Sequence, residues 1–153
     1  MSRYQLAQLN IARMKYPLES PEMADFVANL ERINALADTS PGFVWRLQGK
    51  EGDATSLRFF GDDVLVNMSV WEDVEALHAY AYRSAHAGIM RRRREWFERM
   101  ESVYTVLWWI PAGHRPTPEE ASAKLALLHE EGPTAAAFTF KQAFAAPGTP
   151  CPA

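Results

Sequence analysis

The chain has 153 residues, of which 48% are hydrophobic, 23% charged and 12% aromatic, and this composition excludes disorder as its main state. Sixteen basic and nineteen acidic residues give a net charge of −3, which argues against a nucleic-acid-binding protein. No apolar run reaches the roughly 20 residues that cross a bilayer, and the first residues lack the apolar core of a signal peptide, so we expect a cytoplasmic protein without a membrane partner.

The first half of the chain predicts a strand, a helix and two more strands. Alternating apolar residues favour a strand over residues 4–14. Ser20 and Pro21 then provide an N-cap and a first-turn proline for a helix that ends at the turn Ser40-Pro41-Gly42. Its inner face is expected to carry Met23, Phe26, Val27, Leu30, Ile33 and Ala37. Strands over residues 43–48 and 64–71 follow, joined by a polar loop.

The second half predicts a broken helix, a strand and a C-terminal extension. A helix starts near Glu72 and breaks near Arg83, where Ser84 is expected to cap a second piece. The inner stripe of that piece comprises Tyr82, Ile89, Met90, Trp96, Phe97 and Met100. A strand over 104–110 precedes the capping box Thr117-Pro118-Glu119-Glu120, which starts a helix with Ala121, Leu125 and Leu128 inward. Gly132 ends that helix, and the alternation of Phe138, Phe140 and Phe144 favours a short terminal strand.

This order of elements is typical of the ferredoxin-like split βαβ arrangement, βαββαβ, within the α+β class. The C-terminal helix and the short terminal strand extend it. We expect one domain over residues 1–144 and a flexible, Pro-rich tail over residues 145–153. In this topology the first and third strands are central neighbours.

His86 and Arg93 are expected on the helical side that faces the sheet. His86 would lie in the first turn after Ser84, where the helix dipole keeps an imidazole neutral and suited to base catalysis or ligation, although a structural histidine fits equally. Arg93 falls within the apolar stripe, and a charge there needs a partner. That partner is either a carboxylate of the protein or dimer mate, or an anionic ligand held by a bidentate clamp.

A polar patch is expected on the central strands. Asn67, Ser69 and Trp71 share one face of the third strand, and Gln8 and Asn10 of the first strand should join them. Side-chain amides and an indole N–H can position a carbonyl or enolate oxygen in a cleft. The same amides could instead bond across the two-fold axis of a dimer.

His114 precedes a helix N-terminus, a place that can hold an anion, although an exposed loop histidine fits as well. The only cysteine, Cys151, excludes an intrachain disulfide and a cysteine-ligated zinc cluster. No His-x-x-x-His or Cys-x-x-Cys spacing occurs, so we expect no metal site. The phosphate-binding glycine motifs and the Gly-x-Ser-x-Gly nucleophile motif are absent as well.

Four stretches resemble a bacterial domain-of-unknown-function family that is related to the antibiotic biosynthesis monooxygenases. They are residues 4–10 (YQLAQLN), 40–46 (SPGFVWR), 67–71 (NMSVW) and 108–114 (WWIPAGH). The resemblance implies a homodimeric α/β barrel in which two four-stranded sheets pack face to face, with a cleft between sheet and helices in each protomer. Cofactor-independent monooxygenases of that superfamily use an Asn and a Trp four residues on, a spacing that Asn67 and Trp71 match. Haem-degrading relatives have an Asn on the first strand, a Trp at the end of the third strand and a helical His that binds haem. The resemblance implies Asn10, Trp71 and His86 for these roles, although the interval from Trp71 to His86 is longer here than in those enzymes.

Three functional hypotheses follow. The first is a cofactor-independent monooxygenase or isomerase acting on a small aromatic anion. In it Asn67 and Trp71 hold the oxyanion, His86 moves a proton and Arg93 neutralises substrate charge, with Asn10, Gln8 and His114 as further substrate contacts. The second is a non-enzymatic dimeric binding or scaffold protein whose aromatic residues form core and interface. The third is haem binding through His86.

Overall fold

The computed structural model describes residues 3–48, 60–83, 88, 91–99 and 104–147. Its sheet has four antiparallel strands in the order β2-β3-β1-β4. The strands are β1 (Tyr4–Arg13), β2 (Phe43–Arg46), β3 (Val64–Trp71) and β4 (Thr105–Pro111). The helices are η1 (Pro21–Met23), α1 (Ala24–Thr39), α2 (Val74–Arg83), α4 (Arg93–Trp96) and α5 (Pro118–Glu131). This confirms the predicted α+β class, with β1 and β3 in the centre, and is consistent with a ferredoxin-like fold.

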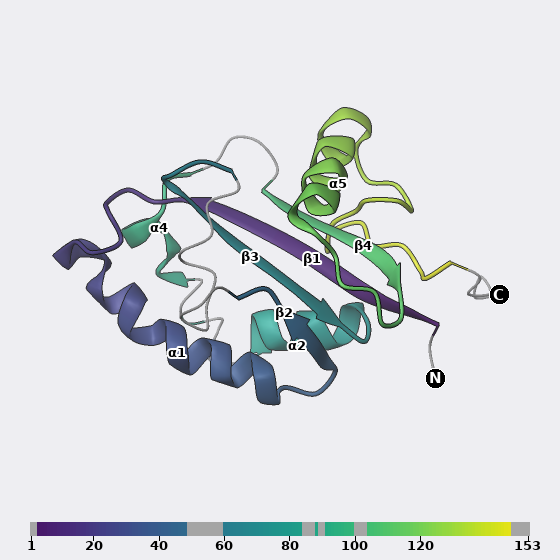
Figure 1. Ribbon diagram of the computed structural model, residues 1–153, viewed down its shortest axis with the longest axis horizontal. Helices are drawn as coiled ribbons and strands as arrows, with labels where there is room; N and C mark the ends of the chain where they lie inside the picture. Colours follow the sequence, from purple (N-terminus) through teal and green to yellow (C-terminus); the bar gives the residue numbers. More distant parts are fainter. Residues whose placement is uncertain (1–2, 49–59, 84–87, 89–90, 100–103, 148–153) are drawn as a thin grey trace.

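Helices cover both faces of the sheet, with α1, α2 and α4 on one side and α5 on the other (Figure 1). Side chains alternate along each strand, so β1 divides its residues between the two faces. Ala7, Leu9 and Ile11 join the buried cluster that contains the inner face of α5. Leu6 and Ala12 belong to two other clusters, which pack toward α2 and α4 respectively. The polar residues between them, Gln8 and Asn10, therefore face the side of α1, α2 and α4.

The start of α5 confirms half of the predicted capping box. Thr117 Oγ1 accepts a hydrogen bond from the backbone N–H of Glu120 at 3.1 Å. The Glu120 carboxylate does not accept a hydrogen bond from the backbone N–H of Thr117, as a complete capping box requires. It accepts instead from Trp108 Nε1 at 2.8 Å and pairs with His114 Nε2 at 2.6 Å. The inward residues Ala121, Leu125 and Leu128 are buried as predicted. Since α5 packs on one face of the sheet, a face-to-face dimer would have to accommodate this helix, and the homodimer stays a prediction.

The first helix differs from the prediction at its start and along its inner face. A 3-10 turn precedes α1, and the Ser20 hydroxyl caps no N–H group but donates to the carbonyl of Pro17 at 2.6 Å. Met23, Ile33 and Ala37 are buried, whereas Val27 is 42% exposed. The prediction that Val27 faces inward is therefore wrong, because the apolar stripe of the sequence is wider than the face that α1 buries.

The predicted break near Arg83 adjoins residues 84–87, which lie outside the described residues, so it stays a prediction. Helix α2 ends at Arg83, and Trp96 and Phe97 are buried around α4. Tyr82 is half exposed, so the prediction that it belongs to the inner stripe was wrong; its ring lies against His78 and Phe140 at the surface. Ser84, Ile89, Met90, Met100 and most of the predicted tail lie outside the described residues.

The predicted terminal strand is reduced to isolated bridges. Phe138 exchanges two backbone hydrogen bonds with Leu107 of β4, at 2.8 and 2.9 Å, and the ladder goes no further. The chain turns at Thr139 instead, where Gln142 N–H bonds to the Thr139 carbonyl. Phe144 then accepts a hydrogen bond from Trp109 Nε1 through its carbonyl oxygen. This C-terminal segment thereby brings residues 139–141 to the side of the sheet that carries α2.

Candidate functional site

A cavity of about 520 Å³ lies between the sheet and helices α1, α2 and α4. The facing side chains of β1 and β3 form its floor, and residues 139–141 of the C-terminal segment contribute to its wall. This volume is within the range of sites that hold one small organic molecule. Gly42 helps to set the frame: with φ of +84° it brings the start of β2 against Ala76 of α2, where a Cβ atom would stand 2.4 Å from the Ala76 Cβ.

Four polar side chains from neighbouring strands form the floor of the cavity. Gln8 lies opposite Ser69, and Asn10 lies opposite Asn67, so the expected grouping on the two central strands is observed. Gln8 Nε2 donates to Asn67 Oδ1 at 2.6 Å and to Ser69 Oγ at 2.8 Å. Gln8 and Ser69 are buried, Asn10 is half-buried and Asn67 is exposed. The patch therefore runs from a buried interior to an accessible rim.

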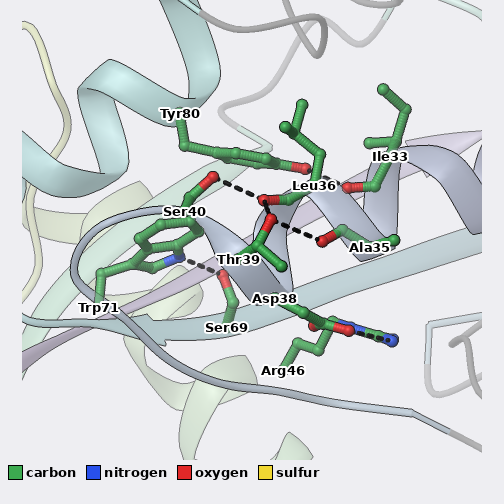
Figure 2. Close-up of polar contacts among 10 residues, drawn as sticks. All are labelled: Ile33, Ala35, Leu36, Asp38, Thr39, Ser40, Arg46, Ser69, Trp71 and Tyr80. Atoms are coloured by element: carbon green, nitrogen blue, oxygen red, sulfur yellow. Dashed lines mark hydrogen bonds and ion pairs between the residues drawn. The ribbon is translucent and has the colours of Figure 1, made fainter.

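Trp71 forms an apolar wall beside this patch. Its ring is 1% exposed and stacks on the Tyr80 ring, with the centroids 5.0 Å apart. Figure 2 shows its indole N–H directed at Ser69, where Nε1 donates to Oγ at 2.8 Å. The predicted contact between this N–H and a ligand oxyanion would require that hydrogen bond to break. In this structure the indole therefore serves as a stacking surface.

Tyr80 lies over Trp71 and reaches α1. Its hydroxyl donates to the carbonyl oxygen of Ile33 at 3.2 Å (Figure 2). Burial raises the pKa of Tyr80 well above the usual tyrosine value, an effect that the nearby Arg46 charge partly offsets. Tyr80 is consequently protonated at neutral pH and cannot serve there as a general base.

Arg93 meets the cavity from α4 as predicted, whereas Arg91 and Arg94 are exposed. Its guanidinium carbon stands 4.2 Å from the centroid of the Tyr104 ring, a cation–π contact. The Nη2 atom is buried and has no hydrogen-bond partner. By contrast, the neighbouring Arg92 binds Asp25 at 2.9 Å and Glu95 at 2.8 Å. The carboxylate partner considered for Arg93 is therefore absent among the described residues.

The charged residues around the cavity are all basic where the chain is described. Arg46 and Lys141 line it together with Arg93, and neither aspartate nor glutamate is among the described lining residues. Asp38 lies just behind and binds Arg46 Nε at 2.8 Å (Figure 2). Asp38 offsets the charge of Arg46, and among the described lining residues the charges of Arg93 and Lys141 have no carboxylate partner. The resulting local field favours an anion.

Of the two histidines predicted at the site, one lies outside the described residues and the other lies away from the cavity. His86 lies outside the described residues, so its expected place beside Arg93 is untested. His114 does not line the cavity; it is bound to Glu120 at the start of α5, on the opposite face of the sheet. His114 also has a protein carboxylate as its partner, so the structure separates it from the other predicted substrate contacts.

Arg46, Tyr80 and Tyr104 are cavity residues that the sequence reading missed. Plain alternation from Phe43 would place Arg46 on the opposite face of the sheet. A register shift between Phe43 and Trp45 reverses this, so Arg46 pairs with Ser69 and shares its face. No sequence signal marks that irregularity. Alternation along β4 would likewise place Tyr104 on the face opposite to Thr105, which lies across from Asn10, so strand periodicity does not predict Tyr104 at the cavity.

Neither metal ligation nor membrane insertion has a structural counterpart in the part of the chain that is described. Within those ranges, no three His, Cys, Asp or Glu side chains come together as a metal site would require. No helix in those ranges combines the length and the apolar character that a membrane crossing demands.

Comparison with known proteins gives one family and a few similar structures. A family model described as "Domain of unknown function (DUF3291)" matches residues 5–152. No curated protein matches the chain. NE2512, a protein of unknown function from Nitrosomonas europaea, is 16% identical with a TM-score of 0.46, over 76% of this chain and 96% of that one. Two structures of SnoaB, a cofactor-independent oxygenase from Streptomyces nogalater, are 16% and 17% identical with TM-scores of 0.46 and 0.45, over 74% of this chain and 97% of each of those.

Proposed function

We propose that this chain, which belongs to the DUF3291 family, binds a small organic anion with an aromatic body in the cavity between the sheet and helices α1, α2 and α4. The observation that carries the proposal is the buried Nη2 atom of Arg93, which has no hydrogen-bond partner. A charged donor removed from water without an acceptor destabilises a protein. A ligand carboxylate would supply that acceptor.

The surroundings of Arg93 support an anionic ligand. The Tyr104 ring holds one face of the guanidinium, so the N–H groups at its edge remain for a planar acceptor. A carboxylate can accept two parallel hydrogen bonds from this edge. Lys141, exposed at the cavity, adds positive charge.

The apolar walls support an aromatic body for the ligand. The stacked rings of Trp71 and Tyr80 contribute at one end, and Phe26 and Trp96 contribute near α4. Flat rings pack against such surfaces with offset or edge-to-face geometry. A cavity that stays open beside these rings favours ligand binding over a scaffold whose aromatic residues only fill a core.

Binding is tested by titrating the protein with benzoate, phenylacetate and indole-3-acetate, using calorimetry. We expect Arg93→Gln to weaken binding about tenfold to a hundredfold, the effect of losing a hydrogen bond to a charged group. Arg94→Gln is the matched control, because Arg94 is the exposed neighbour on the same helix. This variant should bind the acids as tightly as wild type. Absence of binding by all three acids, or equal binding by Arg93→Gln, would overturn the proposal.

We also propose that the bound anion undergoes cofactor-free oxygenation or isomerisation. Support comes from the Asn10 and Asn67 side-chain amides, whose N–H groups have no protein acceptor where the chain is described and line the cavity floor. Such donors stabilise an oxyanion in a reaction intermediate. The proton acceptor would be His86, as the sequence suggested. Oxygen consumption that persists unchanged in an Asn67→Ala, His86→Ala double variant would count against this chemistry.

A further inference from the structure

We propose that the Ser69 hydroxyl is a preset hydrogen-bond donor for a second oxygen atom of the ligand. The ligand would then be an aromatic acid that also carries a carbonyl or phenolate oxygen. This inference rests on the proposed function, since it concerns the same cavity, and it adds the chemical class of the bound molecule.

The argument starts from the hydrogen bonds that Ser69 already accepts. A serine hydroxyl has two lone pairs and one proton. Trp71 Nε1 donates to Ser69 Oγ at 2.8 Å, and Gln8 Nε2 donates to the same atom at 2.8 Å. Both lone pairs are thus occupied, and the hydroxyl proton is left as the only remaining hydrogen-bonding capacity of Ser69.

That proton has no protein acceptor among the described residues. Ser69 is 7% exposed and lines the cavity, so the free donor is buried at the cavity floor. A buried donor without an acceptor is unfavourable until an acceptor arrives. The Ser69 side chain therefore favours a ligand oxygen over an apolar group at the same place.

The neighbouring side chains fix this donor in its role. Gln8 Nε2 uses its second hydrogen on Asn67 Oδ1 at 2.6 Å, which holds the amide nitrogen toward Ser69. Trp71 is 1% exposed and stacked on Tyr80, so its N–H has no room to turn away. Because neither donor can leave Ser69 without losing its own partner, the hydroxyl is preorganised to donate.

The position of Ser69 relative to Arg93 narrows the ligand further. Ser69 lies opposite Gln8 of β1. Arg93 lies over the ring of Tyr104, and the Tyr104 carbonyl accepts a hydrogen bond from the N–H of Ile11, three residues further along β1. Three residues of β1 correspond to roughly 10 Å along the strand. An aromatic ring with an oxygen group at each end, together with one hydrogen bond at each end, has about that length, so one ring can span it. The two oxygen groups should stand on opposite sides of the ring.

The test compares two acids of the same shape, 4-acetylbenzoate and 4-isopropenylbenzoate, which differ by a carbonyl oxygen against a methylene group. We expect the wild-type protein to prefer 4-acetylbenzoate about fivefold to tenfold, the ordinary net effect of one hydrogen bond. Ser69→Ala should abolish the preference. Ser122→Ala, which removes an exposed hydroxyl from α5, should retain it.

A measurement on the wild-type protein covers the case in which Ser69→Ala does not fold. The infrared carbonyl stretch of bound 4-acetylbenzoate should lie below its frequency in an aprotic solvent, as a hydrogen bond requires. Equal, Arg93-dependent binding of both acids, with the carbonyl at its aprotic frequency, would overturn the role of Ser69 and leave the proposed function intact. Failure of both acids to bind would overturn both.

Discussion

Replacing Arg93 by methionine tests whether this side chain serves the ligand or the fold. The change removes the buried, unpartnered Nη2 atom, whose desolvation costs about 1–3 kcal/mol. It also removes the cation–π contact with Tyr104, which stabilises by about 0.5–2 kcal/mol. We therefore expect the free energy of unfolding of the ligand-free protein to lie between about 1 kcal/mol below and about 2.5 kcal/mol above that of wild type.

The assay is urea unfolding without ligand, followed by circular dichroism. For a chain of this length, 1 kcal/mol corresponds to roughly 2–4 °C in Tm, so thermal unfolding provides a second reading. Arg92→Met is the contrasting variant, because Arg92 binds Asp25 and Glu95 and lies over Trp96, and it should lower stability. A loss of more than about 2 kcal/mol in Arg93→Met would refute the reasoning, because removing a partnered buried charge has that effect.

Three further predictions concern the phenol over the cavity, the helix cap and haem. Because burial raises the pKa of Tyr80, the phenol stays protonated in the folded chain while the unfolded chain ionises near pH 10, so stability should be intact below that pH and fall above it. Urea unfolding at pH 9 and pH 11 should show a smaller fall in Tyr80→Phe than in wild type. Thr117→Ala should lower the free energy of unfolding by about 1 kcal/mol, measured in the same way, because the Glu120 N–H loses its acceptor; an unchanged midpoint would mean that this cap does not stabilise α5. If His86 is a haem ligand, titration with haem should give a Soret shift that disappears in His86→Ala; no shift, or the same shift in that variant, would exclude haem ligation by His86.

The sequence predicted the floor of the cavity because strand alternation is a short-range property. Once β1 and β3 are neighbours, period two places Gln8 and Asn10 beside Asn67 and Ser69. Arg93 could be identified in the same way, since a charge within an apolar helical stripe must meet either a partner or a cavity.

The remaining features depend on contacts that no local pattern encodes. The register shift in β2 turns Arg46 toward the cavity, although alternation alone would turn it away. Because the Trp71 N–H donates to Ser69 Oγ, the group left free to donate to a ligand is the Ser69 hydroxyl and not the indole N–H. Only the packed structure shows this hydrogen bond. Similarly, His114 could be recognised as a loop histidine before a helix, but its engagement by Glu120 depends on how α5 lies over the sheet.

The bridge between Phe138 and Leu107 also affects how shortened forms of the protein would behave. An uncovered outer strand can recruit the strand of another molecule and start aggregation. The backbone of Phe138 shields part of β4 from such pairing, while Phe140 belongs to the cavity wall. A chain truncated after Glu131 would lose both at once. Its failure to bind a ligand could then reflect self-association, so a chain that keeps residues 132–147 is the appropriate material for binding studies.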